Sequence, residues 1–428
     1  MPVIGPRIYN LFPLLSGKVS DWSAHLPRIA AMDFNWIFVN PFHYPGFSGS
    51  LYAVKDYHRL HPLLQGDSSE SAETLLRKFV DDAERHGLGV IMDLVINHTA
   101  KDAELVSTHP DWYVREANGE IKSPSAIDPA DANQVTVWGD LAELDYAAKS
   151  GELAQYWARL AADYAGLGIR GFRCDAAYKI PGAVWGTVID ATRAAVPEAQ
   201  FFAETLGARL PETEQLKSAG FDYFFNSAKW WDFREPWLLE QYEMFRKIAP
   251  SIAFPDSHDT TRLAADTDAD PRESALRYLF AACFSSGVMI TQGYEFGFRK
   301  KLDVVRTRPD DWEMPSFDLT AFIRDVNAMK SRVPVLNEEG PQQRVTPPDS
   351  PVTALLRRGR KTPGRTLSLI NTLGGSSHPF GVDAISGVLG AARDSIEEIT
   401  PGQAPLTFRN SSEVSIPARA MRIFHRQE

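Results

Sequence analysis

The sequence predicts an α/β fold: a (β/α)8 TIM barrel with a short inserted subdomain after strand 3 and a C-terminal antiparallel β-sandwich domain. Eight short apolar segments alternate with longer amphipathic segments between residues 7 and 332. Strands that are apolar on both faces and alternate with helices are typical of a parallel sheet, and eight such units over this length fit a barrel with insertions. After residue 332, short alternating runs rich in Gly, Pro and Ser indicate a smaller antiparallel domain.

The expected barrel strands are the short apolar runs, and the expected helices are the segments between them with apolar residues every three or four positions. The strands are residues 8–12, 36–39, 88–96, 171–174, a short run beginning at 201–202, 223–225, 251–254 and 288–291. The clearest helices are residues 21–32, 73–86 and 156–167, and the clearest C-terminal strands are residues 352–356, 366–370, 413–416 and 421–425.

Domain boundaries are expected where this alternation is interrupted. Residues 99–144 are rich in Pro, Asp, Asn and Ser and have no strong period. We expect an inserted subdomain there, because long connections are usually functional or form small structural units. The barrel then comprises residues 1–98 and 145–332, and the β-sandwich domain comprises residues 333–428.

The composition indicates a soluble acidic protein. The formal net charge is −10 and the pI is about 5.6, so the chain lacks the basic footprint that nucleic-acid binding requires. Its two cysteines are too few for a disulfide framework or a four-thiolate zinc site. The N-terminus lacks a signal-peptide pattern, and no run approaches the roughly 20 apolar residues of a membrane span. We therefore expect a cytoplasmic protein without nucleic-acid or membrane partners.

Polar residues follow four of the expected barrel strands at the point where each strand ends. The C-terminal ends of the strands meet at one rim of such a barrel, which is where its active sites lie. These residues are Asp93, Asn97 and His98 on the third strand, Arg173 and Asp175 on the fourth, Glu204 on the fifth, and His258 and Asp259 on the seventh.

This set of residues suits the cleavage of glycosidic bonds. One carboxyl group must protonate the leaving oxygen, and a second must attack the anomeric carbon or position water. Arg173 precedes Asp175 by two positions, so both side chains face the same side of a strand and the cation favours an ionised aspartate. Each feature alone also fits a structural role, such as a turn, an ion pair or a loop hydrogen bond. The occurrence of all four in order, each at its own strand end, favours a site.

The same residues resemble the signatures of the α-amylase family, glycoside hydrolase family 13. The resemblance covers about residues 7 to 332 and implies a barrel with a C-terminal β domain. The four similar signatures are DLVINHT at residues 93–99, GFRCDAA at 171–177, FAET at 202–205 and FPDSHD at 254–259. Two further segments are similar to that family's tyrosine-bearing loop and to its turn after the eighth strand: LYAVKDY at residues 51–57 and GYEFG at residues 293–297.

The resemblance implies a catalytic role for three carboxyl groups. Asp175 would be the nucleophile that forms a covalent glycosyl-enzyme, and Arg173 would hold it ionised. Glu204 would act first as the general acid and then as the general base, and Asp259 would bind ring hydroxyls in the transition state. Retention of configuration then predicts that the Asp175 and Glu204 carboxyl groups lie roughly 5–5.5 Å apart.

The resemblance also implies contacts to the sugar in the cleaved subsite. His98 and His258 would hydrogen-bond that sugar, Tyr52 would stack on its apolar face, and Asp93 would support the site from the third strand. Further substrate contacts are expected from Lys179 on the acceptor side and from Asp303 and Arg306 beyond the cleaved subsite.

The sequence departs from many α-amylases directly after the nucleophile. Those enzymes carry Lys-His at a position where this chain has Tyr178-Lys179. Because that pair contributes to a calcium site in the family, we expect no cofactor here and leave calcium as an alternative. The oxygen ligands that calcium would need are available in Asn97, Asp128, Asp131 and Asp140.

Two other features have both a structural and a functional interpretation. Residues 299–308 form a basic cluster, which fits either a solvated loop or a contact to an anionic group such as the phosphate of a maltose 1-phosphate donor. Tryptophans in the loops fit either packing or sugar platforms, and Trp230-Trp231 is the first candidate platform. We interpret Cys174, which alternates away from the site, as a packing residue.

The leading hypothesis is a retaining α-glycosidase acting on α-1,4-linked gluco-oligosaccharides, of the α-amylase or α-glucosidase type. A transglycosylase such as a maltosyltransferase is the alternative, because it shares the first chemical step. A catalytically inactive binding protein is a remote alternative, since Asp175, Glu204 and Asp259 are all present. A metal-dependent hydrolase is disfavoured, because Arg173 would lie beside the metal cation. The expected partner is an oligosaccharide or glucan, and the oligomeric state is open.

Overall fold

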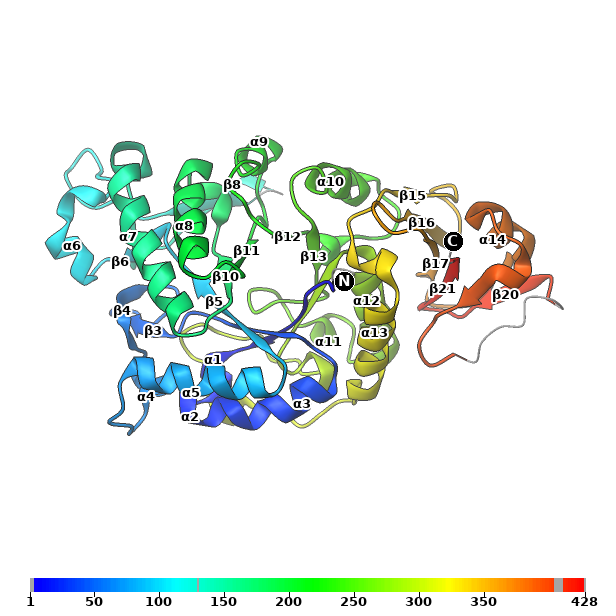
Figure 1. Cartoon of the computed structure of the whole chain (residues 1–428), viewed down its shortest axis with the longest axis horizontal. Coiled ribbons are helices and arrows are strands. Elements are labelled where there is room, and N and C mark those ends of the chain that lie inside the picture. The colour runs from blue at the N-terminus through cyan, green and yellow to red at the C-terminus, as the bar shows by residue number, and fades with distance from the viewer. Residues whose placement is uncertain (1–3, 129–130, 404–410, 427–428) are drawn as a thin grey trace.

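Eight short apolar segments pair side by side as parallel strands and close into a barrel (Figure 1). The computed structural model describes residues 4–128, 131–403 and 411–426, and the side chains of residues 126–134 and 210 lie outside that description. Around the barrel the strands follow the order β1-β14-β13-β12-β11-β10-β5-β2. Their bounds are β1 Arg7–Leu11, β2 Trp36–Val39, β5 Gly89–Leu94, β10 Gly171–Cys174, β11 Gln200–Ala203, β12 Tyr223–Phe225, β13 Ser251–Ala253 and β14 Gly287–Thr291. The predicted barrel is confirmed.

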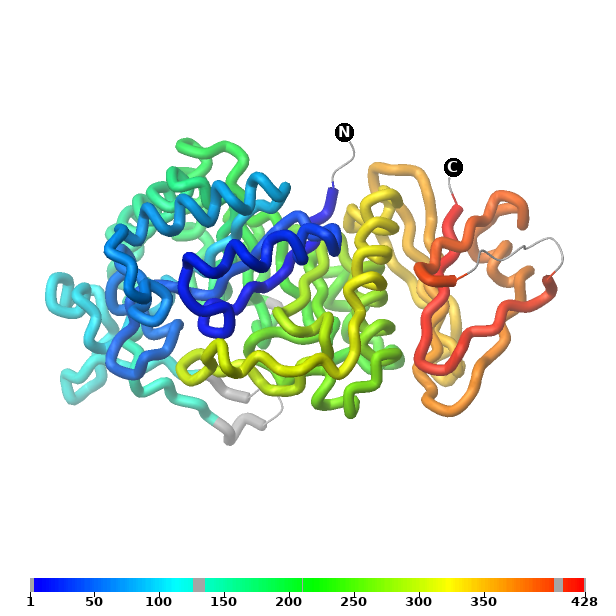
Figure 2. The backbone as a smooth tube through the Cα atoms, turned by 90° about the horizontal axis from the view of Figure 1, so that it is seen from below, coloured from blue at the N-terminus to red at the C-terminus, as the bar shows by residue number. Residues whose placement is uncertain are grey.

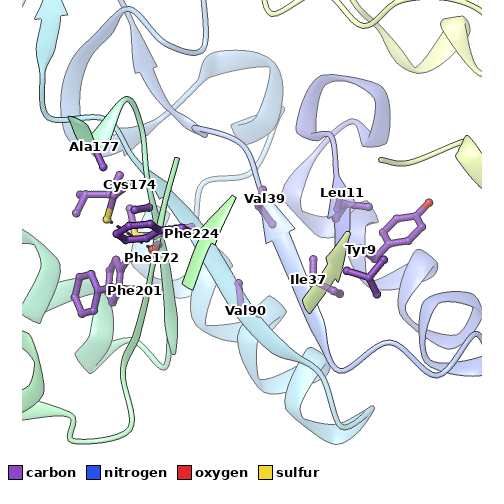
Figure 3. Close-up of a cluster of buried hydrophobic side chains, with 14 of the residues drawn as sticks. Tyr9, Leu11, Ile37, Val39, Val90, Phe172, Cys174, Ala177, Phe201 and Phe224 are labelled. Carbon is purple, nitrogen blue, oxygen red and sulfur yellow. Dashed lines mark hydrogen bonds between the residues drawn. The ribbon is translucent and has the colours of Figure 1, made fainter. Parts of the chain in front are cut away.

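Side chains alternate between the barrel interior and the layer of helices around it, which is why both faces of each strand are apolar. Inside the barrel, Ile8, Phe38 and Phe202 belong to one buried cluster. Their neighbours along the strands belong to a second buried cluster, which also includes residues of the surrounding helices. Figure 3 shows part of this cluster, with the strand residues Tyr9, Leu11, Ile37, Val39, Val90, Phe172, Cys174, Phe201 and Phe224 and with Ala177 from the turn after Asp175. Cys174 is fully buried in this outer layer, so its interpretation as a packing residue is confirmed.

Helices follow most of the strands and cover the outside of the barrel (Figure 1). Their bounds are α1 Pro13–Ser16, α2 Val19–Trp22, α3 Leu26–Ala31, α4 Pro62–Gln65, α5 Ala72–Arg85, α7 Tyr146–Gly166, α8 Gly182–Ala195, α9 Leu210–Glu214, α10 Trp237–Phe245, α11 Leu263–Asp266, α12 Pro271–Phe284 and α13 Thr320–Arg332. None of the helices in the described residues has the length and apolar composition needed to cross a bilayer.

Two predicted helices differ from the observed ones in their extent. The expected helix over residues 21–32 is divided into α2, a 3-10 turn over Ser23–His25, and α3, because Pro27 near the start of α3 has no N–H for the preceding turn. Helix α7 begins ten residues before the predicted start at residue 156. Its N-terminus is capped by Asp145, whose carboxylate accepts from the backbone N–H groups of Ala147 and Ala148.

The connection between β5 and α7 contains small paired strands and one short helix. Strand β6 (His98–Ala100) pairs with β9 (Leu141–Glu143), and β7 (Ser125–Asp128) pairs with β8 (Asp131–Val137) as an antiparallel hairpin. Helix α6 (Glu104–Thr108) lies between them in the sequence. A second hairpin, β3 (His43–Pro45) with β4 (Val54–Leu60), follows β2. The boundaries of the inserted subdomain stay a prediction.

The C-terminal part is a five-stranded antiparallel sheet in the order β15-β16-β17-β21-β19, and this confirms the predicted β domain. A separate pair, β18 with β20, and helix α14 share one apolar core with the sheet. Figure 2 shows this part in orange and red at one end of the molecule, beside α13. The bounds are β15 Gln342–Arg344, β16 Val352–Arg358, β17 Arg365–Asn371, β18 His378–Gly381, α14 Val382–Leu389, β19 Ile396–Glu398, β20 Glu413–Ile416 and β21 Ala420–Arg426.

A buried carboxylate joins the segment before β15 to the end of the barrel. Glu339 accepts from the backbone N–H groups of Ser251 and Ser286, each at 3.0 Å, and from both of their hydroxyl groups. The guanidinium of Arg357 on β16 lies 3.7 Å away and donates to backbone carbonyls, including that of Val335. Both charged side chains are buried, so each depends on the other and on these hydrogen bonds.

We expect Glu339→Ala to lower the free energy of unfolding by about 2–4 kcal/mol, because it leaves buried N–H groups without their acceptor and the Arg357 cation without its counter-ion. The exposed Glu116 provides a matched control, and Glu116→Ala should change stability by less than about 0.5 kcal/mol. Urea denaturation followed by circular dichroism measures both variants. Equal stabilities of the two variants would contradict this account of the junction.

Candidate active site

The register of the strands brings the predicted site residues to one rim of the barrel. Arg173 on β10 pairs directly with Asp93 on β5 and with Phe202 on β11. Asp175 follows Arg173 by two residues and faces the same side, and Glu204 follows the last residue of β11. The carboxylates therefore meet around Arg173 because the polar residues stand at matching heights on neighbouring parallel strands.

The Arg173 guanidinium contacts three carboxyl groups. Its Nη1 donates to both oxygens of Asp93 at 2.9 Å and to Oδ1 of Asp175 at 2.7 Å. Its Nη2 lies 3.9 Å from Oε2 of Glu204. Arg173, Asp93 and Glu204 are buried, and the Asp175 side chain is mostly buried. One cation therefore compensates several acids in a site that excludes most of the water.

Glu204 combines burial with an environment that favours its protonated form. Burial raises the pKa of Glu204 to about 7, and the nearby Asp175 adds to this effect, whereas Arg173 opposes it. The backbone N–H of Ala176 donates to its Oε2 at 2.9 Å, and that of Leu206 donates to its Oε1 at 2.6 Å. These two bonds fix the position of the carboxyl group. A carboxyl group that keeps its proton near neutral pH is able to act as a general acid.

Tyr52 links Asp93 to His258. Burial and the neighbouring Asp93 raise the pKa of the Tyr52 hydroxyl well above its ordinary value, so it stays protonated and donates to Asp93 at 2.7 Å. His258 Nε2 lies 2.7 Å from the same oxygen. Because the hydroxyl has one proton, His258 must donate from Nε2. Asn40, which sequence analysis missed, also donates to this oxygen at 3.1 Å; its position directly after β2 was the available signal.

Asp259 lies beside His258 at the opening of the site. Its Oδ2 is 3.0 Å from His258 Nε2, and its side chain is more exposed than those of the other site carboxylates. Desolvation acts to raise its pKa, but His258 and Arg173 outweigh this and lower the pKa of Asp259 to about 2. The third predicted carboxylate is therefore ionised over the working pH range. His98 Nε2 donates to the backbone carbonyl of Tyr52 at 3.1 Å.

A cavity of about 330 Å³ contains these residues, a volume within the range of small-molecule sites. Of the predicted residues, it brings together Tyr52, His98, Asp175, Lys179, Glu204 and Asp259. Asp93, Arg173 and His258 lie behind this surface and hold it in place. The remaining lining residues are Ser50, Asn97, Pro124, Trp138, Asp140, Leu141, Ala176, Tyr178 and Val304.

The tryptophan that lines the cavity is not one of the two predicted. Trp231 is 1% exposed and packs against Phe280, so its prediction as a platform is wrong. Trp230 is 52% exposed and touches Phe254 edge-on, outside the cavity lining. Trp138, at the end of the β7–β8 hairpin, lines the cavity instead, with Lys179 Nζ 5.4 Å above its ring. Lys179 also donates to the Ser125 carbonyl at 3.3 Å.

The two outermost predicted contacts are not part of the cavity lining. Asp303 Oδ1 accepts from the backbone N–H groups of Val305 and Arg306 at 2.8 and 2.9 Å, so this carboxylate stabilises a turn. Arg306 is exposed on that turn. In the basic cluster, Arg299 pairs with Asp268 and Lys300 with Asp311, which favours the interpretation as a solvated loop.

The alternative of a calcium site was examined against the His, Cys, Asp and Glu side chains of the described residues. Among residues 4–128, 131–403 and 411–426, no three His, Cys, Asp or Glu residues lie together as metal ligands. The side chains of Asp128 and Asp131 lie outside the described residues, while Asn97 and Asp140 line the cavity. Calcium binding stays a prediction.

This chain is similar to a protein-family model and to several known proteins. A family model described as the glucanotransferase domain of glycogen debranching enzyme matches residues 6–123. The α-1,4-glucan:maltose-1-phosphate maltosyltransferase of Burkholderia pseudomallei is 31% identical over 371 residues, which are 84% of this chain and 32% of that protein. The chain thus spans about a third of the length of this relative.

Solved structures show the same fold over the whole chain. An α-amylase from Lactobacillus plantarum superposes with a TM-score of 0.76 and 19% identity, covering 98% of both chains. The maltogenic α-amylase AmyB from Thermotoga neapolitana superposes with a TM-score of 0.75 and 21% identity, covering 100% of both chains. The barrel and the C-terminal β domain are therefore shared with these proteins.

The raised pKa of Glu204 makes a prediction about stability. Between pH 4.5 and about 7 the folded protein retains a proton that the unfolded chain releases, so wild-type stability falls as pH rises through this window. Glu204→Gln has no proton to release there. We expect the free energy of unfolding of the variant, relative to that of the wild type, to increase by on the order of 1–3 kcal/mol between pH 4.5 and pH 8. Denaturation curves at several pH values measure this, and parallel pH profiles for the two proteins would contradict it.

Proposed function

Because this chain belongs to the α-amylase family of glycoside hydrolases and transglycosylases, we propose that it cleaves α-1,4-glucosidic bonds in gluco-oligosaccharides with retention of configuration. The observation that carries this proposal is the arrangement of Asp175 and Glu204 on the two sides of one buried guanidinium, that of Arg173. It gives the site one carboxylate bonded to a cation and one carboxyl group that holds a proton near neutral pH.

In the proposed first step, Asp175 attacks the anomeric carbon while Glu204 transfers its proton to the bridging oxygen. The C–O bond to the leaving half breaks, and a covalent glycosyl-Asp175 ester forms. In the second step the ionised Glu204 accepts a proton from water, which attacks the same carbon and releases Asp175. Asp259, charged and open to the cavity, binds the ring hydroxyls of the donor sugar.

Transfer to a sugar acceptor is the second candidate function. Trp138 offers an exposed ring on the side of the cavity that Lys179 and Tyr178 line, and a sugar stacked there would compete with water for the intermediate. The Burkholderia pseudomallei relative carries the name of a maltosyltransferase. In this candidate, the ammonium group of Lys179 would face an anionic leaving group such as phosphate.

We expect the purified protein to convert maltoheptaose into shorter sugars. The Asp175→Asn variant should do so at least about a thousandfold more slowly, because it cannot form the covalent intermediate. Asp81→Asn, on the exposed face of α5, is the matched control and should keep the wild-type rate. Chromatography of the products makes the measurement. Products longer than maltoheptaose indicate transfer. No conversion of maltoheptaose, maltose 1-phosphate, sucrose or trehalose would refute an α-glucoside-active enzyme.

The pKa of Glu204 predicts the alkaline limb of the activity. Since the general acid must be protonated, kcat/KM should fall about tenfold per pH unit above a pKa of about 7. With α-maltosyl fluoride, whose leaving group needs no proton, Glu204→Gln should retain far more activity than with maltoheptaose, for which we expect a loss of about 10²–10⁴. If kcat/KM of the wild type already fell above the ordinary pKa of a glutamate side chain, the assignment of Glu204 as the general acid would be contradicted.

A further inference from the structure

We infer that the cavity is closed on the side opposite Glu204, so that the enzyme attacks glucan chains only from their non-reducing ends. This inference rests on the proposed retaining chemistry, which fixes the direction in which a chain lies in the site. It adds the substrate class, the free non-reducing ends of linear chains, and it excludes attack within a chain.

The chemistry gives the two sides of the cavity different roles. Glu204 protonates the oxygen that leaves, so the leaving half of the chain lies on the Glu204 side. The donor sugar extends the other way, and its non-reducing side points away from Glu204. Arg173 reflects this division, because Nη2 faces Glu204 whereas Nη1 faces Asp93 and Asp175.

The barrel topology shows which loops meet the non-reducing side. In the closed order β1-β14-β13-β12-β11-β10-β5-β2, strand β1 stands directly opposite β11, which carries Glu204. Strands β2 and β14 flank β1. The loops that follow β2 and β14 therefore lie across the barrel from the general acid, where a longer donor chain would have to pass.

These two loops join each other at the cavity. The backbone N–H of Leu51 donates to the carbonyl of Val304 at 3.0 Å. The side chain of Val305 lies against Gly49, close enough to meet an added Cβ at 3.8 Å. The neighbouring Ser50 and Val304 line the cavity itself. The two loops are thus in direct contact beside the cavity, and in the proposal they form a wall on this side.

Hydrogen bonds within each loop hold the wall in place. Asp303 caps the turn that carries Val304, and Arg308 Nη1 donates to the carbonyl of Val305 at 2.8 Å. The other loop is closed by the backbone bond from Ala53 to Ser50 and is braced by Asp102, which accepts from the Phe47 N–H at 3.2 Å. Asp303 Oδ1 is already occupied by the two backbone N–H groups of this turn, and the predicted contact of Asp303 with a further sugar stays a prediction.

At the point where the two loops join, the wall consists of small side chains. Ser50 and Val304 line the cavity with one hydroxyl group and one branched apolar side chain, and a single neutral hydroxyl group binds a further sugar less strongly than a charged group does. The whole cavity measures about 330 Å³ and must hold the donor sugar together with the start of the leaving half. We therefore expect the sugar released from the non-reducing end to be glucose or maltose, both early and late in the reaction.

The test compares 4-nitrophenyl α-maltoheptaoside with the same compound blocked by a 4,6-O-ethylidene group at its non-reducing end, and with cyclomaltoheptaose. We expect cleavage of the free compound, a rate at least about twentyfold lower for the blocked one because its end group clashes with the wall, and no cleavage of the ring. Cleavage of the blocked compound within about twofold of the free one would overturn the inference alone. Failure to cleave any of the three would overturn the proposed function, and the inference with it.

A double variant, Ser50→Gly with Val304→Gly, tests whether these two side chains form the wall. We expect the ratio of blocked to free cleavage to rise at least about fivefold, because space opens behind the donor sugar. Met314, which is 88% exposed and follows the same strand β14, provides the control, and Met314→Ala should leave the ratio unchanged. An unchanged ratio in the double variant would overturn the assignment of the wall.

Discussion

The buried guanidinium of Arg173 is the constraint on which the rest of the site depends. A single cation contacts Asp93, Asp175 and Glu204 in a region from which most water is excluded. One positive charge cannot support three buried negative charges, so part of the set must hold protons near neutral pH. Burial raises the pKa of Asp93 to about 6 and that of Glu204 to about 7. Burial, only partly offset by Arg173, thus favours a protonated Glu204, which is the general acid of the proposed mechanism.

The fold supplies this arrangement through the register of its parallel strands. Arg173 and Asp93 are direct partners across β10 and β5, and the barrel is closed, so no strand can shift without breaking the whole set of pairs. Tyr52 adds a bond from outside the barrel, because its hydroxyl joins Asp93 to His258 on the far side of the site. Burying these acidic groups destabilises the folded protein, and the hydrophobic layers on both sides of the strands offset this loss of free energy.

Sequence analysis predicted the barrel and the inner site because both depend on patterns within single segments. Apolar strands and the polar residues that end them are visible in the sequence, and strand alternation correctly turned Cys174 away from the site. It failed where a role depends on distant contacts. Trp230 and Trp231 look equivalent in the sequence, yet only the structure shows Trp231 against Phe280. For Asp303, by contrast, the unforeseen contacts are local, because its carboxylate caps a turn through the N–H groups of Val305 and Arg306.

We expect the choice between hydrolysis and transfer to depend on the acceptor side of the cavity, which the sequence motifs do not describe. The first chemical step is common to both, so Asp175, Glu204 and Arg173 carry no information about the acceptor. In the proposed mechanism, water and a sugar would then compete for one intermediate, and the surface around Trp138 and Lys179 would affect how long a sugar stays in place. A wall behind the donor sugar limits the length of the unit held on the enzyme, and an aromatic ring in front of it favours retention of the leaving half. The proposed chemistry is thus compatible with a hydrolase or a transferase, and we expect the balance to depend on a few side chains at the end of the β7–β8 hairpin and after Asp175.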